Sequence, residues 1–191
     1  MKTATLDRRL VRTRSALLGA FRDLIQRHHY EDVGVADIAA RANIGRSTFY
    51  AHFSGKDALL ASSIAGPFAV LANSIGARHD TPNLVQLLEH FWANRTLARA
   101  VLQGPARRKS VAVLVGLMEQ RLRDEGLGRR GSLILPTRLA AIQLSELLLA
   151  TITAWLIGES RCSPEVLAFA LRRVGAAALG AMQTSAANKN I

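Results

Sequence analysis

The hydrophobic positions near the start of the chain recur with helical spacing. Leu17, Leu18, Phe21, Leu24 and Ile25 follow the pattern of one amphipathic helix face. The pattern stops at residues 28–30, where His-His-Tyr places donor side chains at the negative end of a helix. We therefore predict a first helix of several turns that ends just before residue 30.

The next hydrophobic pattern, in residues 35–53 (VADIAARANIGRSTFYAHF), is typical of two short helices joined by a tight turn. Ile38 and Ala42 are four positions apart and share an inward face of the first helix. Asn43 tolerates the left-handed backbone that a helix end often needs. Gly45 then lets the chain turn into the second helix. The stretch predicts a helix-turn-helix, a unit whose second helix enters the DNA major groove.

The side chains of that second helix divide into two faces. At about 100° per residue, Phe49 and Phe53 point into the core while Ser47 and Ala51 lie opposite. Thr48 and Tyr50 lie on the flanks, and Arg46 is in the first turn, where recognition helices contact base edges. Any small helical domain has an apolar pair and a polar face. The pattern alone therefore fits both a DNA recognition helix and an ordinary amphipathic helix.

The run from about residue 12 to residue 60 resembles the amino-terminal domain of the TetR family of bacterial repressors. The most specific part is GRSTFYAHFSGKDALL, residues 45–60, supported by Ala20–Phe21, Tyr30 and residues 37–39 (DIA). Three positions depart from the family pattern: His29 replaces a usual Gly, Gly34 a usual Thr cap, and Asn43 a frequent Gly. His and Asn tolerate positive φ and Gly is a passable cap, so the departures leave the fold unaffected.

The remaining chain has helical periodicity throughout. We expect the Ser54–Asp57 segment to form a capping box for a new helix that Gly66–Pro67 kinks or ends. Further helices are predicted at residues 84–92, 96–103, 110–125, 137–157 and 165–182, and no strand-like alternation is present. The predicted fold class is all-α, with a three-helix DNA-binding domain at residues 1–56 and a larger helical ligand-binding and dimerisation domain at 57–191.

Two of the later helices are unusual in composition. Residues 139–158 are apolar almost all round and long enough to span a bilayer, but Glu146 at the centre favours a buried helix of a soluble protein. The last helix contains Gly175 and Gly180 among alanines, which indicates close packing against another helix. By resemblance to the family, residues 139–157 and 165–182 form a four-helix bundle with a second copy of the chain.

Charge and cysteine content narrow the class of protein. The 191 residues carry a formal net charge of +11, which suits a polyanionic partner. Residues 1–14 contain five of the basic side chains, either as an arm that contacts phosphates or as a frayed terminus. The single Cys162 and the absence of a signal peptide predict a cytoplasmic protein, and no membrane partner is expected.

No motif for catalysis or metal binding is found. There is no Gly-rich phosphate loop and no G-x-S-x-G motif, and the adjacent His28 and His29 point about 100° apart on a helix. We therefore expect no enzyme, no cofactor and no metal.

These features predict a homodimeric repressor that a small-molecule effector releases from a palindromic double-stranded DNA operator. Arg46, Ser47 and Ala51 are expected to face bases. The residues expected at the DNA backbone are Thr48, Tyr50, His52 and Lys56. Phe91, Trp92 and Met118 are candidate effector contacts, although each fits a plain core equally well. Two alternatives remain: an architectural DNA-binding protein with little sequence preference, and a helical enzyme or carrier.

Overall fold

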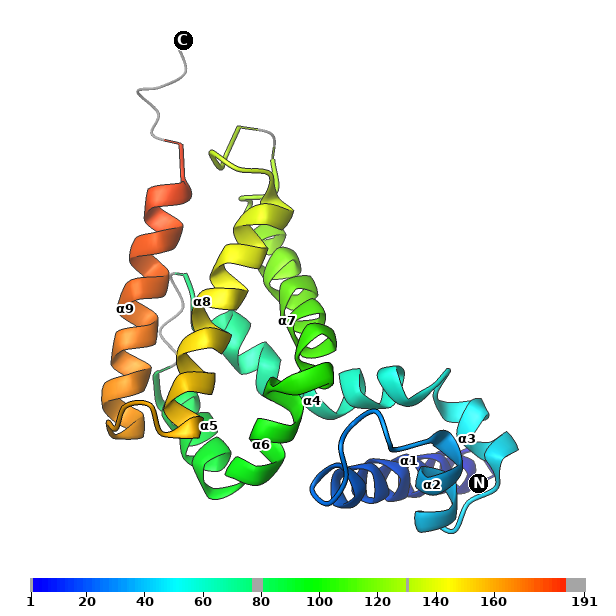
Figure 1. Cartoon of the computed structure of the whole chain (residues 1–191). Coiled ribbons are helices and arrows are strands. Elements are labelled where there is room, and N and C mark those ends of the chain that lie inside the picture. The colour runs from blue at the N-terminus through cyan, green and yellow to red at the C-terminus, as the bar shows by residue number, and fades with distance from the viewer. Residues whose placement is uncertain (1, 77–80, 130, 185–191) are drawn as a thin grey trace.

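The computed structural model describes residues 2–76, 81–129 and 131–184, with side chains from residue 8 onward, and this part of the chain is built from helices. A small head and a larger body are joined by one long helix (Figure 1). In chain order the helices are α1 (Lys2–Ile25), α2 (Val35–Arg41), α3 (Arg46–His52), α4 (Lys56–Asn73), α5 (Thr81–Ala93), α6 (Arg95–Leu102), α7 (Gly104–Asp124), α8 (Thr137–Ile157) and α9 (Pro164–Met182). The predicted all-α class is confirmed.

The head has one small core to which each of its three helices contributes. Leu17 and Phe21 of α1, Ile38 of α2 and Phe49 of α3 are all fully buried. The ring of Tyr30, in the α1–α2 loop, stands edge-on to Phe21 with centroids 6.3 Å apart. The helical spacing read from the sequence therefore selected the correct core residues.

The body is organised around α7, which packs against α4, α6 and α8, while α9 packs on α5 and α8. Leu144, Leu148 and Ile152 of α8 have no exposed surface. By length and a mean hydropathy of 1.6, α8 passes as a membrane span, but half of that window is buried inside the protein. Its Glu146 is paired with Arg107 of α7 at 2.6 Å. These contacts make α8 a core helix of the body.

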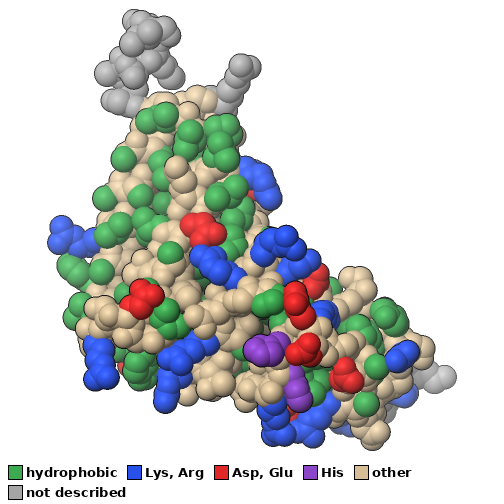
Figure 2. Space-filling view, viewed as in Figure 1, with side chains coloured by type: hydrophobic (Ala, Val, Ile, Leu, Met, Phe, Trp, Pro, Cys, Tyr) green, Lys and Arg blue, Asp and Glu red, His purple; other side chains and the backbone are tan. Residues whose placement is uncertain are grey.

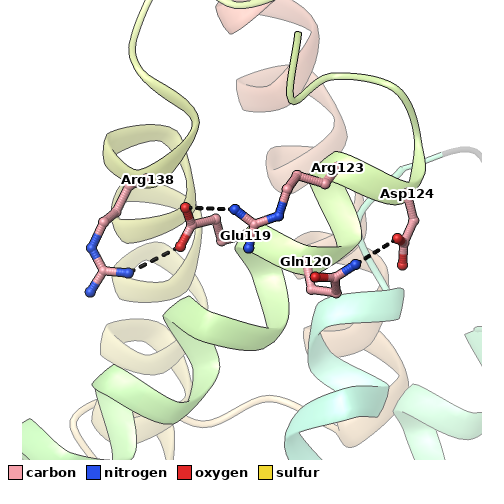
Figure 3. Close-up of polar contacts among 5 residues, drawn as sticks. All are labelled: Glu119, Gln120, Arg123, Asp124 and Arg138. Carbon is pink, nitrogen blue, oxygen red and sulfur yellow. Dashed lines mark hydrogen bonds and ion pairs between the residues drawn. The ribbon is translucent and has the colours of Figure 1, made fainter.

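Polar contacts join α7 to the beginning of α8 (Figure 3). The Glu119 carboxylate accepts a hydrogen bond from Arg123 one turn later and another from Arg138 of α8, both at 3.0 Å. On the neighbouring face of α7, Gln120 donates to Asp124 at 2.8 Å. Glu119 is therefore shared between two helices, which fixes the start of α8 on the end of α7.

Three local expectations are corrected by the structure. Residues 2–14 form the first turns of α1 instead of a separate arm. Of the two outcomes expected at Gly66–Pro67, a kink or an end of the helix, the end does not occur: α4 continues through Pro67 to Asn73, and Phe68 and Leu71 beyond the proline are buried. That packing outweighs the roughly 3 kcal/mol that a proline costs inside a helix. The predicted capping box at the start of α4 is absent: Gly55 is the N-cap, and the Asp57 carboxylate bonds to Tyr30.

Candidate DNA-binding interface

The turn between α2 and α3 is closed by the backbone. The N–H of Ile44 donates to the carbonyl of Ala39 at 2.9 Å, and that of Asn43 to Ala40 at 3.0 Å. Asn43 has a φ of 54°, the left-handed conformation expected from the sequence. Gly45 is the N-cap of α3, and its extended backbone conformation is one that any residue adopts. The α2–turn–α3 unit is the predicted helix-turn-helix.

The side chains of α3 separate into a buried anchor and an exposed face. Phe49 has no exposed surface, and Phe53, just after the helix, is 5 % exposed. The Tyr50 side chain is 58 % exposed, and its ring rests edge-on against Phe49 with centroids 5.5 Å apart. Of the other predicted DNA contacts on this helix, His52 is half-buried and the rest are exposed, namely Arg46, Ser47, Thr48 and Ala51. The helix thus presents a polar, accessible surface from a rigid base.

Lys56, the first residue of α4, holds the α1–α2 loop. Its ammonium donates to the carbonyls of Tyr30 at 2.8 Å, Glu31 at 3.1 Å and Val33 at 3.0 Å. It also lies 4.6 Å from the centroid of the Tyr30 ring, a cation–π distance. An ammonium has three donors, and all three are used here. A DNA phosphate at Lys56 would therefore compete with the three carbonyls.

Asp57 joins the head to the body. Its carboxylate accepts a hydrogen bond from the Tyr30 hydroxyl and lies 2.5 Å from the Lys109 ammonium of α7. The bonds from Lys109 and from Tyr30 lower the pKa of the Asp57 carboxyl below its ordinary 3.8. Burial and the bond to Asp57 raise the pKa of the Tyr30 phenol, so Tyr30 stays a neutral donor at physiological pH.

A second link between α1 and α4 comes from Arg14. Its guanidinium donates to the Ser62 hydroxyl at 2.6 Å and lies 4.8 Å from the centroid of the Phe53 ring. This basic side chain, expected from the sequence to contact phosphates or solvent, stays exposed at the surface while it connects α1 to α4. Two sets of contacts to α4 therefore hold the position of α3: those of Lys56 with the α1–α2 loop, and those of Arg14 with Ser62 and Phe53.

Comparison with known proteins agrees with this arrangement. Residues 17–62, which span α1 to the first turns of α4, match the family model described as bacterial regulatory proteins, tetR family. The crystal structure of a TetR transcriptional regulator from Streptococcus agalactiae 2603V superposes with a TM-score of 0.59 at 25% identity, covering 91% of this chain and 99% of that one. The chain belongs to the TetR family.

Two curated relatives align with part of this TetR-family chain. It is 34% identical over 105 residues to the uncharacterized HTH-type transcriptional regulator YxbF of Bacillus subtilis, covering 54% of the chain and 27% of the relative. It is 33% identical over 79 residues to the HTH-type dhaKLM operon transcriptional activator DhaS of Lactococcus lactis, covering 41% of the chain and 42% of the relative. The aligned stretch spans less than half the length of either relative.

The three candidate effector contacts do not share one site. Phe91 lines a cavity of about 290 Å³ beside α4, and Trp92 lines a different cavity at the end of α8. Met118 is fully buried in the interior of the body. The structure thus brings none of these three side chains together around a single ligand.

Sequence reasoning missed the residues that connect the two parts of the protein. Asp57 was interpreted as a capping acid, and Lys109 was not singled out. No local pattern relates them, because their contact arises only when α7 folds back onto the start of α4. The one available signal was that Asp57 directly follows Gly55 and Lys56 in the stretch that resembles the family.

We predict that replacing Lys56 with methionine destabilises the head. The three carbonyls lose their donor while the aliphatic stem is kept, so the free energy of unfolding should fall by about 1–3 kcal/mol. Urea denaturation of the full chain measures it. The matched control is Arg27→Met at an exposed position of the same loop region, which should leave stability nearly unchanged. Equal stability of both variants would contradict the role of Lys56.

The Asp57–Lys109 pair predicts a pH-dependent stability difference. A carboxyl whose pKa is lowered by folding stabilises the native state above its unfolded pKa, and that stabilisation is lost as pH falls through the folded pKa. Lys109→Met should therefore lower the unfolding midpoint at neutral pH, and the difference from wild type should shrink as the pH falls below 3.8 and through the lowered pKa of folded Asp57. Lys109→Arg keeps the charge and is the control. A difference that persists unchanged in acid would assign the effect to packing.

Proposed function

We propose that this TetR-family chain is a homodimeric DNA-binding repressor that a small-molecule effector releases from a near-palindromic operator. The observation that carries the proposal is the exposed polar face of α3, which is anchored by the fully buried Phe49. A recognition helix needs this combination, because base contacts require side chains held at fixed positions. A cytoplasmic location follows from this role.

The exposed side chains of α3 suit two kinds of DNA contact. Arg46 lies in the first turn, and its guanidinium can donate two hydrogen bonds to O6 and N7 of a guanine. The small side chains of Ser47 and Ala51 allow the helix to approach the base edges closely. Thr48 and Tyr50 offer hydroxyls on the flanks for phosphate oxygens, with His52 at the end of the helix. The net charge of +11 adds attraction that is independent of sequence.

An exposed apolar face on the body supports the dimer. Hydrophobic side chains gather over α8 and α9 in Figure 2. On α8, Leu139 is 48 % exposed, and on α9, Phe169 is 57 % exposed; Ile142, Ile157, Val166 and Val174 are also exposed. A face of this kind is typical of a protein contact. To read successive major grooves, the two α3 helices of such a two-fold dimer would have to lie about one DNA turn, roughly 34 Å, apart.

The two glycines of α9 differ in role. A Cβ on Gly175 would lie 2.8 Å from Cδ1 of the buried Ile75, so this glycine packs against its own subunit and the sequence-based expectation of a partner contact is corrected. Nothing lies within 4 Å of a Cβ on Gly180. At helical spacing Gly180 shares a stripe with Val166, so it remains a candidate for close packing of the partner.

The cavity beside α4 is the candidate effector site. It is lined by Ile64, Pro67 and Phe68 of α4, Phe91 of α5 and Val101 of α6, and it also touches Arg22 of α1. A ligand there would contact the helix that leads into the head. A ligand that binds more tightly to one position of α4 increases the population of that conformation. If the two α3 helices of the dimer are wrongly spaced in it, affinity for the operator falls.

Activation is the second candidate action, favoured by the name of the relative DhaS, an operon activator. A reporter gene behind the region upstream of the chain's own gene separates the two actions. Deletion of the regulator raises expression if it represses and lowers it if it activates. A footprint on the same DNA distinguishes both from an architectural protein, which protects DNA without sequence preference, and from a helical enzyme, which protects none.

Arg46→Ala should relax specificity at one base position in each half-site, at a cost of about 1–3 kcal/mol. Binding to a series of single-base operator variants measures this. Tyr50→Phe is the matched comparison: it removes one hydroxyl and should weaken binding to all variants alike, by about 1 kcal/mol. If Arg46→Ala weakens every variant equally, Arg46 contacts phosphate and not a base.

Phe169→Glu should shift the protein towards monomer, since it places a charge in an apolar contact. Sedimentation velocity measures the shift, and affinity for the full operator should fall much more than affinity for one half-site. Ala112→Glu, the same added charge at an exposed position of α7, is the control and should stay dimeric. A Phe169→Glu protein that remains dimeric would place the interface elsewhere.

A further inference from the structure

A second cavity lies at the end of the body formed by α5, α6, the carboxyl end of α8 and the α8–α9 connection. Its volume is about 650 Å³. Its lining includes Trp92, Arg99, Trp155, Arg161 and Cys162, and none of these residues lines the cavity beside α4. Trp92 and Phe91 are neighbours on α5 and so point about 100° apart, one towards each cavity.

One wall of this cavity is aromatic. The rings of Trp92 and Trp155 are 4.8 Å apart between centroids and inclined by 35°. Trp155 is 5 % exposed, and its indole N–H donates to the carbonyl of Cys162 at 3.0 Å, which fixes the ring and the connection together. Trp92 is 41 % exposed. A large indole surface is thus held in place and remains accessible to a planar ring.

The polar part of the lining is cationic. The guanidinium of Arg99 is held by the carbonyl of Leu156 at the end of α8, with Nε at 2.8 Å. Arg161, in the exposed α8–α9 connection, also lines the cavity. Among the described residues that line this cavity none is acidic. Two guanidiniums without a carboxylate between them attract an anion and disfavour a cationic ligand.

We propose that this cavity binds a small planar aromatic carboxylate, with its ring against Trp92 and its carboxylate between Arg99 and Arg161. The volume falls in the range of about 300–1,000 Å³ that small-molecule sites occupy. An aliphatic acid would leave the indole surface without a stacking partner, and a neutral aromatic would leave the guanidiniums without a counter-charge. The site goes beyond the proposed function, which names no ligand and uses another cavity.

The chain carries its own reporters of this site. Its only two tryptophans, Trp92 and Trp155, and its only cysteine, Cys162, all line the cavity. Benzoate added to the full-length protein should change tryptophan emission in a saturable way and should slow the reaction of Cys162 with a thiol reagent at the same concentrations. Benzamide, which lacks the charge, and cyclohexanecarboxylate, which lacks the aromatic ring, should bind more weakly than benzoate.

The Arg161→Gln variant tests whether the carboxylate binds in this cavity. Arg161 is exposed and makes no hydrogen bond or ion pair to the part of the chain that the structure describes. Its replacement should weaken benzoate binding by about 10-fold, as expected for one charge-assisted hydrogen bond. Arg108→Gln, the same change at an exposed position of α7, should bind benzoate as wild type does.

Either of two results would overturn the proposal: no saturable change in emission, or benzoate binding that leaves the Cys162 reaction rate and the Arg161→Gln affinity unaffected. Neither readout requires DNA. A failure here therefore leaves the proposed regulator standing, and a failure of operator binding leaves this site standing.

Discussion

The first turn of α4 is the junction on which the arrangement of the molecule depends. Lys56 supplies all three donors to carbonyls of the α1–α2 loop, and Asp57 connects Tyr30 of that loop to Lys109 of the body. Lys56 thus holds the α1–α2 loop of the head against α4, and the adjacent Asp57 attaches the head to α7. Because each of these directional contacts involves at least one charged group, they fix an orientation, whereas apolar contacts alone would permit several.

The position of the exposed face of α3 depends on this junction. The seven-residue α3 is too short to be stable by itself in water, so its conformation comes from packing. Phe49 provides the packing from below, and Arg14 reaches from α1 past Phe53 to Ser62 of α4. A displacement of α4 relative to α7 therefore moves the whole reading surface as one piece, which is the property that an effector-controlled regulator requires.

Local physical rules explain what the sequence could predict. Helical spacing selected Ile38, Phe49 and Phe53 as core, and the tolerance of asparagine for positive φ placed the turn at Asn43. The same rules could not find contacts between distant segments, such as Asp57 with Lys109. They also could not decide whether Pro67 kinks or ends α4, because the burial of the residues beyond it comes from tertiary packing. The DNA contacts themselves follow from the residue types on α3 and stay predictions.

The inward contact of Gly175 links the interior of one subunit to its outer surface. Ile75 occupies the space that a side chain at position 175 would need, so a larger residue there requires either Ile75 to shift or α9 to move outward. The same helix carries Phe169 and Val174 on its exposed side. In the proposed homodimer, a substitution that never touches the second copy would then distort the surface that this copy must match. In a genetic screen such a lesion would resemble an assembly mutant, although its origin is a packing fault inside a single chain.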